Sequence, residues 1–503
     1  MQGARVNKSD EMECNGQPLH ALVIPYPTQG HVTPMMQFAK KLASNGLIVT
    51  FLTTHHRHAQ ITKAHSSTED SILLESRNRG LDIRSALISD GLPLDFDRSA
   101  KFYDFMQSVD NMGEALEELI SDLNKKEPPI SCVIADAFLF WSLDVTRRFG
   151  IPWISFWTQP VAVYSIYYHF HLLKSHGHYP PSGPGQCEDW IDYIPGVPKI
   201  QPKDLPSFLQ PQDVGSDYVL DMILKSLLSA RRADWVLCNS FYELEPHSVN
   251  AMNTKPPFLT IGPVLPSAYL DGQNPKDIAV GTSFWTEFER SQEWLDTKPK
   301  ESVIYVSFGS LVHVPQIQIE EIAMGLKESG QPFLWVLRPD LVASEVSDFL
   351  PHGFMEETAG QGLVVPWSPQ LQVLSHTSVG GFLTHCGWNS VAEAIALGVP
   401  MLGFPLWTDQ YTNCKLLADE WKIGLRLKRG AHGDERVVSR EEISRAVSEL
   451  VAGEGGKEMK NRVRALRETA KMAVSKGGSS YKNMEAFIEG LKLSFSFHEK
   501  SSA

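Results

Sequence analysis

Short apolar segments alternate with helical patterns along most of the chain. The apolar segments of the first half, each expected to form a strand, are HALVIPYP, LIVTFLTT, SCVIAD, PWISFW and DWVLCNS. Those of the second half are SVIYVSFGS, FLWVLRP, GLVVPW, VGGFLTH, VPMLGF and IGLRLK. Apolar strands that alternate with helices are typical of parallel sheets covered on both faces. The pattern therefore predicts an α/β protein with two Rossmann-like halves.

The chain of 503 residues is too long for a single core, so we looked for breaks in this pattern. Residues 1–17 are polar and are expected to be disordered. Between residues 256 and 300, the dipeptides PP, GP, DG and NP interrupt the periodic positions and predict a linker. The expected domains are therefore 18–255 and 301–478, followed by a last helical segment over 479–503.

The first strand leads into a helical pattern, TPMMQFAKKLASNG. Thr33 is expected to cap this helix, Pro34 to take its first position, and Gly46 to follow its end. His31 lies between the strand and this cap, in PYPTQGH.

The most informative stretch is the 44 residues from Trp367 to Gln410. Within it an apolar strand ends at a CG turn, and the helical pattern SVAEAIAL follows, with Gly398 expected to end the helix. Asn389 or Ser390 is expected to cap this helix. Backbone N–H groups and the positive end of the helix dipole would then face the turn, where a phosphate can be held.

Polar side chains around this turn suit a ligand that joins an anion to two sugars. The His385 imidazole can donate a hydrogen bond there. Glu393 lies one helical turn after Asn389 and can accept hydrogen bonds from a sugar diol. Asp409 and Gln410 follow the next strand and supply the carboxylate and amide groups that a hexose requires.

A candidate general base follows from the ends of two other strands, because ligands of open α/β sheets bind beyond the carboxyl ends of the strands. His31 follows the first strand and Asp136 follows CVIA. If they converge, Asp136 can accept from one imidazole nitrogen while the other nitrogen takes a proton from an acceptor hydroxyl, which typically contributes about 10²–10⁴-fold in rate. A lone histidine there could instead make a structural hydrogen bond.

The stretch from Trp367 to Gln410 resembles the signature box, called PSPG, of plant family 1 UDP-dependent glycosyltransferases, which act on small secondary metabolites. PYPTQGH and VIADAF resemble two further motifs of this family, and the resemblance covers nearly the whole chain beyond residue 17. It implies the GT-B fold, in which two Rossmann-like domains face a cleft and the last helix crosses back to the first domain. It also implies a monomer that needs no metal or other cofactor besides the UDP-sugar donor.

The resemblance also implies a role for particular residues. His31 would be the catalytic base and Asp136 its partner. The donor-binding residues would be Trp367 on uracil, Gln370 and Glu393 on the ribose, Ser310, His385, Asn389 and Ser390 on the diphosphate, and Thr158, Trp388, Asp409 and Gln410 on the sugar, with Ser368 and Gly387 completing the set. Trp388 together with Gln410 favours glucose. Ser368 and Ala392 depart from the commoner family residues without removing a contacting side chain.

Composition narrows the function further. The net charge of −13 disfavours a nucleic-acid surface or an anionic membrane as partner. Six cysteines without a CxxC pair argue against zinc and against a disulfide framework, which suits a reducing compartment. The polar N-terminus lacks the apolar core of a signal peptide and no run is long enough to span a membrane, so we expect a cytoplasmic protein.

The expected reaction is inverting, metal-independent transfer of a hexose, glucose being favoured, from a UDP-sugar to a hydroxyl of a small hydrophobic acceptor. The HHRH run at 55–58 lacks carboxylates or thiolates at ligand spacing, which disfavours a metal site. A nucleotide-dependent oxidoreductase is disfavoured because GxGxxG is absent. A non-catalytic binding protein with a donor fold is the remaining alternative.

The identity of the acceptor does not follow from the sequence. Residues 55–110 and 160–215, where the acceptor pocket should form, contain no motif that identifies the acceptor.

Overall fold

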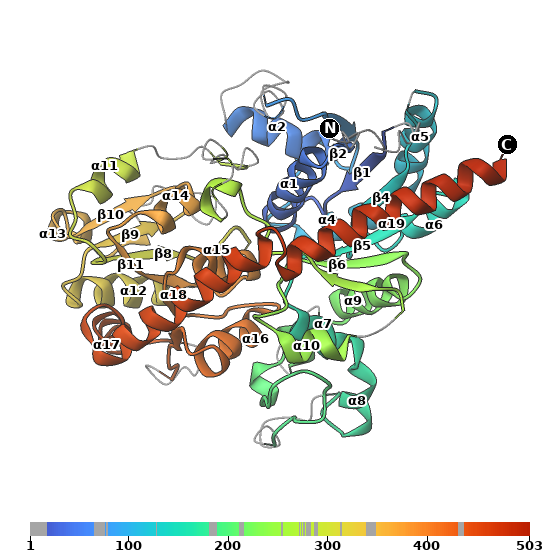
Figure 1. Cartoon of the computed structure of the whole chain (residues 1–503). Coiled ribbons are helices and arrows are strands. Elements are labelled where there is room, and N and C mark those ends of the chain that lie inside the picture. Colours follow the sequence, from blue (N-terminus) through green and yellow to red (C-terminus); the bar gives the residue numbers. More distant parts are fainter. Residues whose placement is uncertain are drawn as a thin grey trace, which may run out of the picture.

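The computed structural model contains two lobes side by side, each built on a parallel sheet (Figure 1). It describes residues 18–502 except for 65–75, 77–78, 127, 181–188, 211–215, 253–254, 271, 273, 275–276, 278–282, 286–289, 312–313, 339–348 and 431–436. Residues 1–17, which were expected to be disordered, lie outside this described part.

The N-terminal lobe contains a seven-stranded sheet with the order β3-β2-β1-β4-β5-β6-β7. Its strands are β1 (His20–Ile24), β2 (Ile48–Thr54), β3 (Ile83–Ile88), β4 (Cys132–Asp136), β5 (Trp153–Trp157), β6 (Trp235–Cys238) and β7 (Phe258–Thr260). All neighbouring strands pair in parallel. The strand order reverses between β1 and β4, and such a switch point is where open α/β sheets form a ligand crevice.

The C-terminal lobe contains a six-stranded sheet with the order β10-β9-β8-β11-β12-β13. Its strands are β8 (Val303–Ser307), β9 (Phe333–Val336), β10 (Gly362–Val365), β11 (Val379–Thr384), β12 (Met401–Gly403) and β13 (Gly424–Arg426). These pairs are also parallel. Here the order reverses between β8 and β11, so each lobe has its own switch point.

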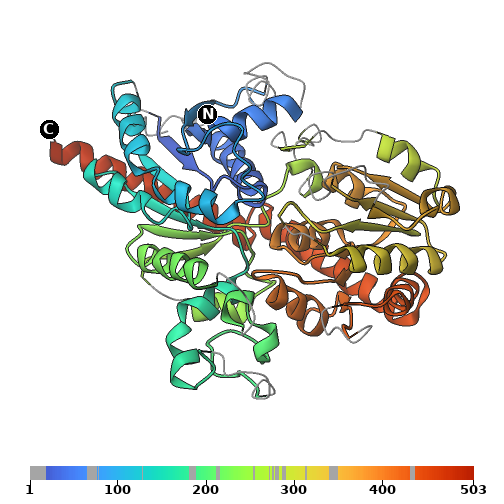
Figure 2. The same cartoon turned by 180° about the vertical axis from the view of Figure 1, so that it is seen from behind.

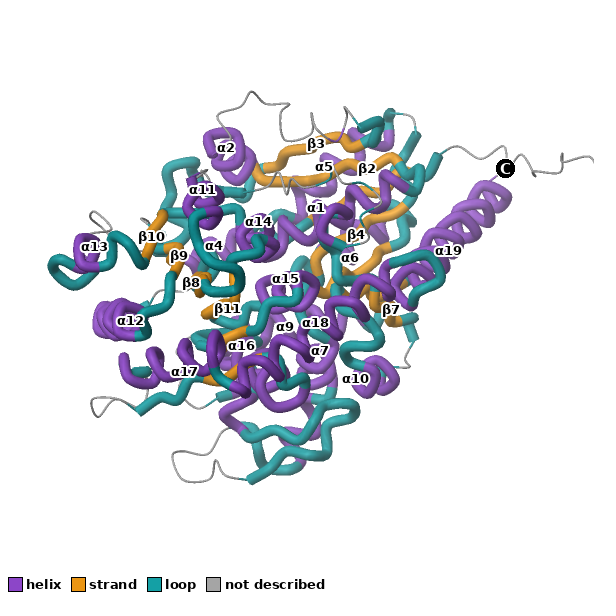
Figure 3. The backbone as a smooth tube through the Cα atoms, turned by 60° about the vertical axis from the view of Figure 1, so that its left-hand side comes forward, coloured by secondary structure: helices purple, strands orange, loops and turns teal. Residues whose placement is uncertain are grey.

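Helices enclose both sheets, as the smooth trace in Figure 3 shows. Those of the N-terminal lobe are α1 (Gln29–Ser44), α2 (His55–Ala64), α4 (Phe102–Asp110), α5 (Gly113–Asn124), α6 (Ser142–Arg148), α7 (Val161–Tyr168), α8 (Phe170–Ser175), α9 (Ser216–Ala230) and α10 (Pro246–Ala251). Those that follow are α11 (Arg290–Asp296), α12 (Gln316–Glu328), α13 (Phe354–Glu357), α14 (Gln370–Ser375), α15 (Trp388–Leu397), α16 (Gln410–Lys415), α17 (Arg440–Ala452), α18 (Glu454–Val474) and α19 (Ser479–Ser502).

Burial of both sheet faces explains why the strands are apolar throughout. In β1, Ala21 and Val23 belong to the core cluster that includes Phe38 of α1, whereas Leu22 and Ile24 belong to the cluster on the other face. Successive side chains of a strand point to opposite faces, so a strand covered on both sides needs apolar residues at every position.

The last helix crosses from the C-terminal to the N-terminal lobe. α18 contributes Val463 to the core of the C-terminal lobe, whereas α19 contributes Phe487 to the core around β1. Ser480 Oγ donates to the Gly262 carbonyl at 2.6 Å, and Asn483 Nδ2 donates to the Thr260 carbonyl at 2.8 Å. Figures 1 and 2 show α19 in red along the N-terminal lobe from opposite sides.

Two expectations about chain organisation were wrong. The stretch 256–300 is not only a linker, because β7 lies within it and forms the edge of the N-terminal sheet. A strand of three residues among prolines is too short to give a periodic pattern.

The second wrong expectation concerns the start of the first helix. α1 begins at Gln29, so Thr33 does not cap it and Pro34 lies inside the helix. The proline removes one backbone N–H from the helix but does not end it.

The helix after the CG turn also starts earlier than expected. α15 begins at Trp388 with Gly387 as its N-cap residue, and neither Asn389 nor Ser390 caps it. The Asn389 side chain instead donates to the Gly30 carbonyl, and Ser390 Oγ accepts a hydrogen bond from Gln370. Its end is as expected, because Gly398 follows with a φ of 75° in the left-handed region.

Candidate active site

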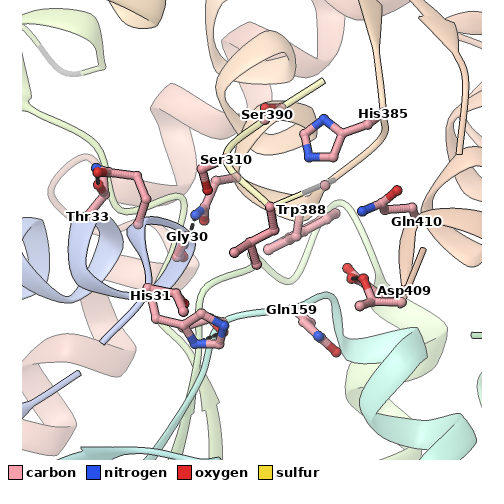
Figure 4. A pocket seen from close by; sticks show the side chains of 18 of the residues that line it. Gly30, His31, Thr33, Gln159, Ser310, His385, Trp388, Ser390, Asp409 and Gln410 are labelled. Carbon is pink, nitrogen blue, oxygen red and sulfur yellow. Dashed lines mark hydrogen bonds between the residues drawn. The ribbon is translucent and has the colours of Figure 1, made fainter. Parts of the chain in front are cut away.

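A cavity of about 590 Å³ lies between the two switch points and is lined by residues of both lobes. Figure 4 shows its lining, with His31 on one side and the residues of the C-terminal lobe facing it. The carboxyl ends of β1, β4 and β5 lead to one side of this cavity, and those of β8 and β11 lead to the other.

His31 and Asp136 form a hydrogen-bonded pair on the N-terminal side. His31 Nδ1 lies 2.6 Å from Asp136 Oδ2, and Thr158 Oγ1 lies 3.2 Å from the same nitrogen. The Asp136 side chain is only 1% exposed, and its Oδ1 accepts from the backbone N–H of Phe138 at 3.0 Å. A carboxylate that accepts from Nδ1–H leaves Nε2 as the proton acceptor of a neutral imidazole. The pair therefore has the geometry of a positioned general base.

Aromatic rings hold the imidazole on two sides. The His31 ring lies 5.5 Å from the Tyr26 ring and 5.4 Å from the Phe138 ring, measured between centroids. Both aromatic residues line the cavity. The environment of the base is thus mostly apolar, which strengthens electrostatic interactions inside the cavity.

The turn after β11 places His385 on the opposite side. Burial, together with the smaller effect of the positive charge of Arg338, lowers the pKa of His385 to about 4, so the imidazole is neutral at pH 7. A Cβ at Gly309 or at Gly387 would lie 2.5 or 2.4 Å from His385 Nε2. Only glycine permits this close approach. A neutral imidazole held between two glycine turns can donate one hydrogen bond to an anion at the start of α15.

A buried polar cluster lies beside this turn. Gln370 Nε2 donates to Glu393 Oε2 at 2.8 Å and to Ser390 Oγ at 3.0 Å. Tyr305 OH lies 3.2 Å from Ser368 Oγ. Burial raises the pKa of Glu393 to about 7, although the hydrogen bond from Gln370 opposes this shift. The cluster thus combines hydrogen-bond acceptors and donors around one titratable carboxyl group.

Two polar residues face the cavity from the start of α16. Gln410 Oε1 accepts from the backbone N–H groups of Leu406 and Trp407, both at 2.9 Å, and its nitrogen points toward Trp388 in Figure 4. Asp409 accepts from Asn413 Nδ2 at 2.6 Å and from Thr408 Oγ1 at 2.7 Å. These bonds fix the orientation of an amide and a carboxyl group that could bind hydroxyls.

Comparison with known proteins agrees with this architecture. The family described as UDP-glucoronosyl and UDP-glucosyl transferase matches residues 279–468. UDP-glycosyltransferase 86A2 of Arabidopsis thaliana is 45% identical over 474 residues, which cover 94% of each chain. The chain belongs to the plant family 1 UDP-glycosyltransferases.

Solved structures of UDP-glycosyltransferases share the GT-B fold seen here. Os79 from O. sativa in complex with UDP superimposes with a TM-score of 0.79 at 30% identity, covering 94% of this chain and 100% of that one. Phytolacca americana UGT2 complexed with UDP-2fluoro-glucose and pterostilbene gives a TM-score of 0.76 at 28% identity, with the same coverage. Membership of this enzyme family removes the oxidoreductase alternative.

The predicted donor residues of this UDP-glycosyltransferase come together at one cavity. Those that line it are Thr158, Ser310, Trp367, Ser368, Gln370, His385, Gly387, Trp388, Asn389, Ser390, Glu393, Asp409 and Gln410. Trp388 Nε1 also donates to the Asn239 carbonyl of the other lobe at 2.7 Å. His31 lines the same cavity, with Asp136 behind it. Their individual roles remain predictions.

Sequence reasoning missed two residues next to this set. Trp285 stacks on Trp367 with a centroid distance of 4.4 Å and an interplanar angle of 30°. Arg338 is buried, its Nη1 donates to the Ser310 carbonyl at 2.6 Å, and its guanidinium carbon lies 5.4 Å from the Trp285 ring centroid. Arg338 lies two residues after the end of the strand β9, so the rule that ligands gather at strand ends could have found it. Trp285 gave no such signal, since it falls in the stretch taken as a linker.

The described residues contain no group of three or more His, Cys, Asp or Glu side chains arranged to hold a metal ion. Within the same part of the chain, no helix combines the length and apolar character that a membrane crossing would need.

Proposed function

We propose that this UDP-glycosyltransferase transfers a hexose, with glucose favoured, from a UDP-sugar to a hydroxyl of a small hydrophobic acceptor, with inversion. The observation that carries the proposal is that the His31–Asp136 pair and the amino end of α15 open onto one cavity from opposite lobes. A base on one side and an anion site on the other are the two elements that this transfer needs.

In the proposed reaction, Asp136 holds the His31 tautomer whose Nε2 is unprotonated. Nε2 takes the proton of the acceptor hydroxyl as its oxygen bonds to the anomeric carbon. The bond from that carbon to the phosphate oxygen breaks, and UDP leaves with the electron pair. Because the acceptor and the leaving group lie on opposite faces of the sugar ring, the configuration at the anomeric carbon inverts.

The leaving diphosphate would be stabilised by groups that carry no formal charge. The backbone N–H groups at the start of α15 and the dipole of this helix favour an anion, and Asn389, Ser390, Ser310 and the neutral His385 ring add side-chain donors. A diphosphate held in this way is a good leaving group without a general acid or a metal ion.

The nucleoside and the sugar would occupy the remaining donor residues. Trp367 would stack on uracil, and Gln370 and Glu393 would bind the ribose. The amide of Gln410 and the carboxyl of Asp409 would bind sugar hydroxyls beside Trp388 and Thr158. Glucose is favoured because Trp388 and Gln410 occur together. UDP and a UDP-sugar analogue are bound in the solved relatives Os79 and Phytolacca americana UGT2, respectively.

A transfer assay with defined stereochemistry tests the proposal. The purified chain is incubated with UDP-glucose and a panel of phenols, flavonoids and terpenoid alcohols, once with and once without EDTA. We expect UDP release matched by a β-glucoside, identified from its anomeric proton coupling, and no loss in EDTA. An α-glucoside, or a requirement for added metal, would contradict the proposed mechanism.

A further inference from the structure

A short segment of the N-terminal lobe, residues 201–210, is hydrogen-bonded to the C-terminal lobe. It contains two turns of 3₁₀ helix, η1 (Pro202–Asp204) and η2 (Ser207–Leu209). Leu209 is buried in a core cluster of the N-terminal lobe, so the segment is fixed to that lobe. Phe208 is also buried and lines the cavity. The segment therefore connects the core of one lobe with the wall of the cavity.

Within this segment, Ser207 bonds to both backbone groups of Thr408 in the C-terminal lobe. The Ser207 N–H donates to the Thr408 carbonyl at 2.9 Å, and the Thr408 N–H donates to Ser207 Oγ at 3.0 Å. Thr408 has a φ of 56°, in the left-handed region that is unfavourable for a β-branched residue. Such a conformation persists where surrounding contacts fix it. The two bonds to Ser207 are contacts of this kind.

Thr408 directly precedes Asp409 and Gln410, the two residues proposed to bind sugar hydroxyls. Both of these residues line the cavity (Figure 4). Thr408 Oγ1 donates to Asp409 Oδ1 at 2.7 Å. Gln410 Oε1 accepts from the backbone N–H groups of Leu406 and Trp407, which come earlier in the same turn. Both side chains are therefore oriented by a turn that the opposite lobe holds.

A second group of bonds between the lobes lies beyond these two residues. Asp204 is buried, and its Oδ1 accepts from Arg426 Nη1 at 2.6 Å. The Asp204 carbonyl accepts from Thr412 Oγ1 at 2.6 Å, and Thr412 belongs to α16. Bonds to the N-terminal lobe thus occur both before and after Asp409 and Gln410 in the sequence.

From these contacts we infer that Ser207 is a positioning residue for the sugar of the donor, although it belongs to the lobe opposite the donor residues. The inference rests on the proposed function, which assigns Asp409 and Gln410 to the sugar. Ser207 lies in the described part of the chain, is buried and does not line the cavity, so it acts through the backbone of Thr408. Without the Ser207 hydroxyl, the turn loses one of the bonds that fix it.

The substitution Ser207→Ala separates this role from a general loss of structure. UDP has no sugar that could contact the turn, so we expect its Kd, measured by calorimetry, to change by less than about twofold. The Kd for UDP-glucose should rise about three- to tenfold, the range expected when one hydrogen bond is lost. Equal weakening of UDP and UDP-glucose, or no weakening of either, would overturn the inference.

Ser248→Ala is the matched control for this measurement. Ser248 is similarly buried, and its Oγ donates to the Gly196 carbonyl at 2.7 Å within the N-terminal lobe. We expect this variant to bind UDP and UDP-glucose as the unmodified chain does. A rise in the Kd for UDP-glucose equal to that of Ser207→Ala would contradict a specific role of Ser207.

A double-mutant cycle with Gln410 tests whether Ser207 acts through the turn. The ratio kcat/KM for UDP-glucose is measured with 2-naphthol as the acceptor in Ser207→Ala, in Gln410→Ala and in the double variant. Ser207→Ala alone should lower kcat/KM about three- to tenfold, but about twofold or less when Gln410 is already alanine, because a group that it positions is gone. Effects that multiply in full would contradict the inference.

The Gln410→Ala variant also separates this inference from the proposed function. If Gln410→Ala raises the Kd for UDP-glucose while Ser207→Ala leaves it unchanged, the inference fails and the assignment of the sugar stands. If Gln410→Ala leaves this Kd unchanged, the assignment of Gln410 to the sugar fails in the proposed function, and the inference fails with it.

Discussion

Asn389 Nδ2 donates to the Gly30 carbonyl across the gap between the lobes, at 2.5 Å. In a regular helix that carbonyl would accept from the N–H of the residue four positions later, which here is Pro34 and has none. The proline inside α1 therefore leaves an acceptor for the start of α15. Gly30 precedes His31, so this bond connects the expected anion site to the expected base.

Asn389→Asp should be more harmful than Asn389→Ala. The Asn389→Ala variant loses one hydrogen bond, so we expect the free energy of UDP-glucose binding to become about 1 kcal/mol less favourable. Aspartate adds a negative charge that faces both the Gly30 carbonyl and the bound diphosphate. We expect calorimetry to give a Kd for UDP-glucose at least about tenfold higher for Asn389→Asp than for Asn389→Ala. Equal affinities in the two variants would contradict this position of Asn389.

Glu393 should make UDP-glucose binding dependent on pH. Its pKa is raised to about 7 in the free protein, so the carboxyl group is mostly protonated at pH 6 and mostly ionised at pH 8. The ionised form accepts hydrogen bonds from both ribose hydroxyls, and we expect affinity to rise about fivefold over this interval. UDP-glucose is the suitable ligand because its phosphates stay ionised throughout. The Glu393→Gln variant should show a flat profile, and an unchanged slope in that variant would reject the assignment.

The same carboxyl group should affect folding stability in the opposite direction. Its pKa rises from 4.5 in the unfolded chain to about 7 in the folded protein, so the folded protein binds this proton more tightly. The contribution to the free energy of unfolding therefore falls as pH rises from about 4.5 to 7, by at most about 3 kcal/mol. Denaturant unfolding of Glu393→Gln should show less loss of stability over this window than the unmodified chain. Parallel curves would contradict the raised pKa.

Trp285 should act on the donor through Trp367. Trp285 stacks on Trp367 and does not line the cavity, whereas Trp367, the residue proposed to bind uracil, does. We expect Trp285→Ala to raise the KM for UDP-glucose about three- to tenfold, the range for loss of an aromatic pair, with kcat nearly unchanged. Trp285→Phe should restore most of the affinity. A fall in kcat without a change in KM would contradict this positioning role.

Much of the fold could be predicted because most strands are covered on both faces. β1 and β11 are buried at every position, and such continuous apolar runs are visible in the sequence. The predicted fold class is confirmed by the two parallel sheets and by the solved relatives. β3 was missed because it lies at a sheet edge and is only partly buried in its middle, which gives it polar positions.

The cavity was easier to predict on the donor side than on the acceptor side. Most of the predicted donor residues lie within one stretch of sequence, where a strand, a turn and a helix follow in order. The side proposed to hold the acceptor is lined by Phe102, Phe208, Met222 and Trp407, which are far apart along the chain. Such a pocket depends on long-range packing and carries no local pattern.

The most direct test of the account is the effect of His31→Ala on two separate quantities. We expect kcat/KM for 2-naphthol to fall by about 10²–10⁴-fold. The Kd for UDP, measured by calorimetry, should change by no more than about twofold, because the base and the donor residues lie on different lobes. His176→Ala is the matched control, since this exposed histidine stacks on Tyr193 and does not line the cavity. Full turnover in His31→Ala, or a loss of UDP binding equal to the loss of turnover, would contradict a general base opposite the anion site.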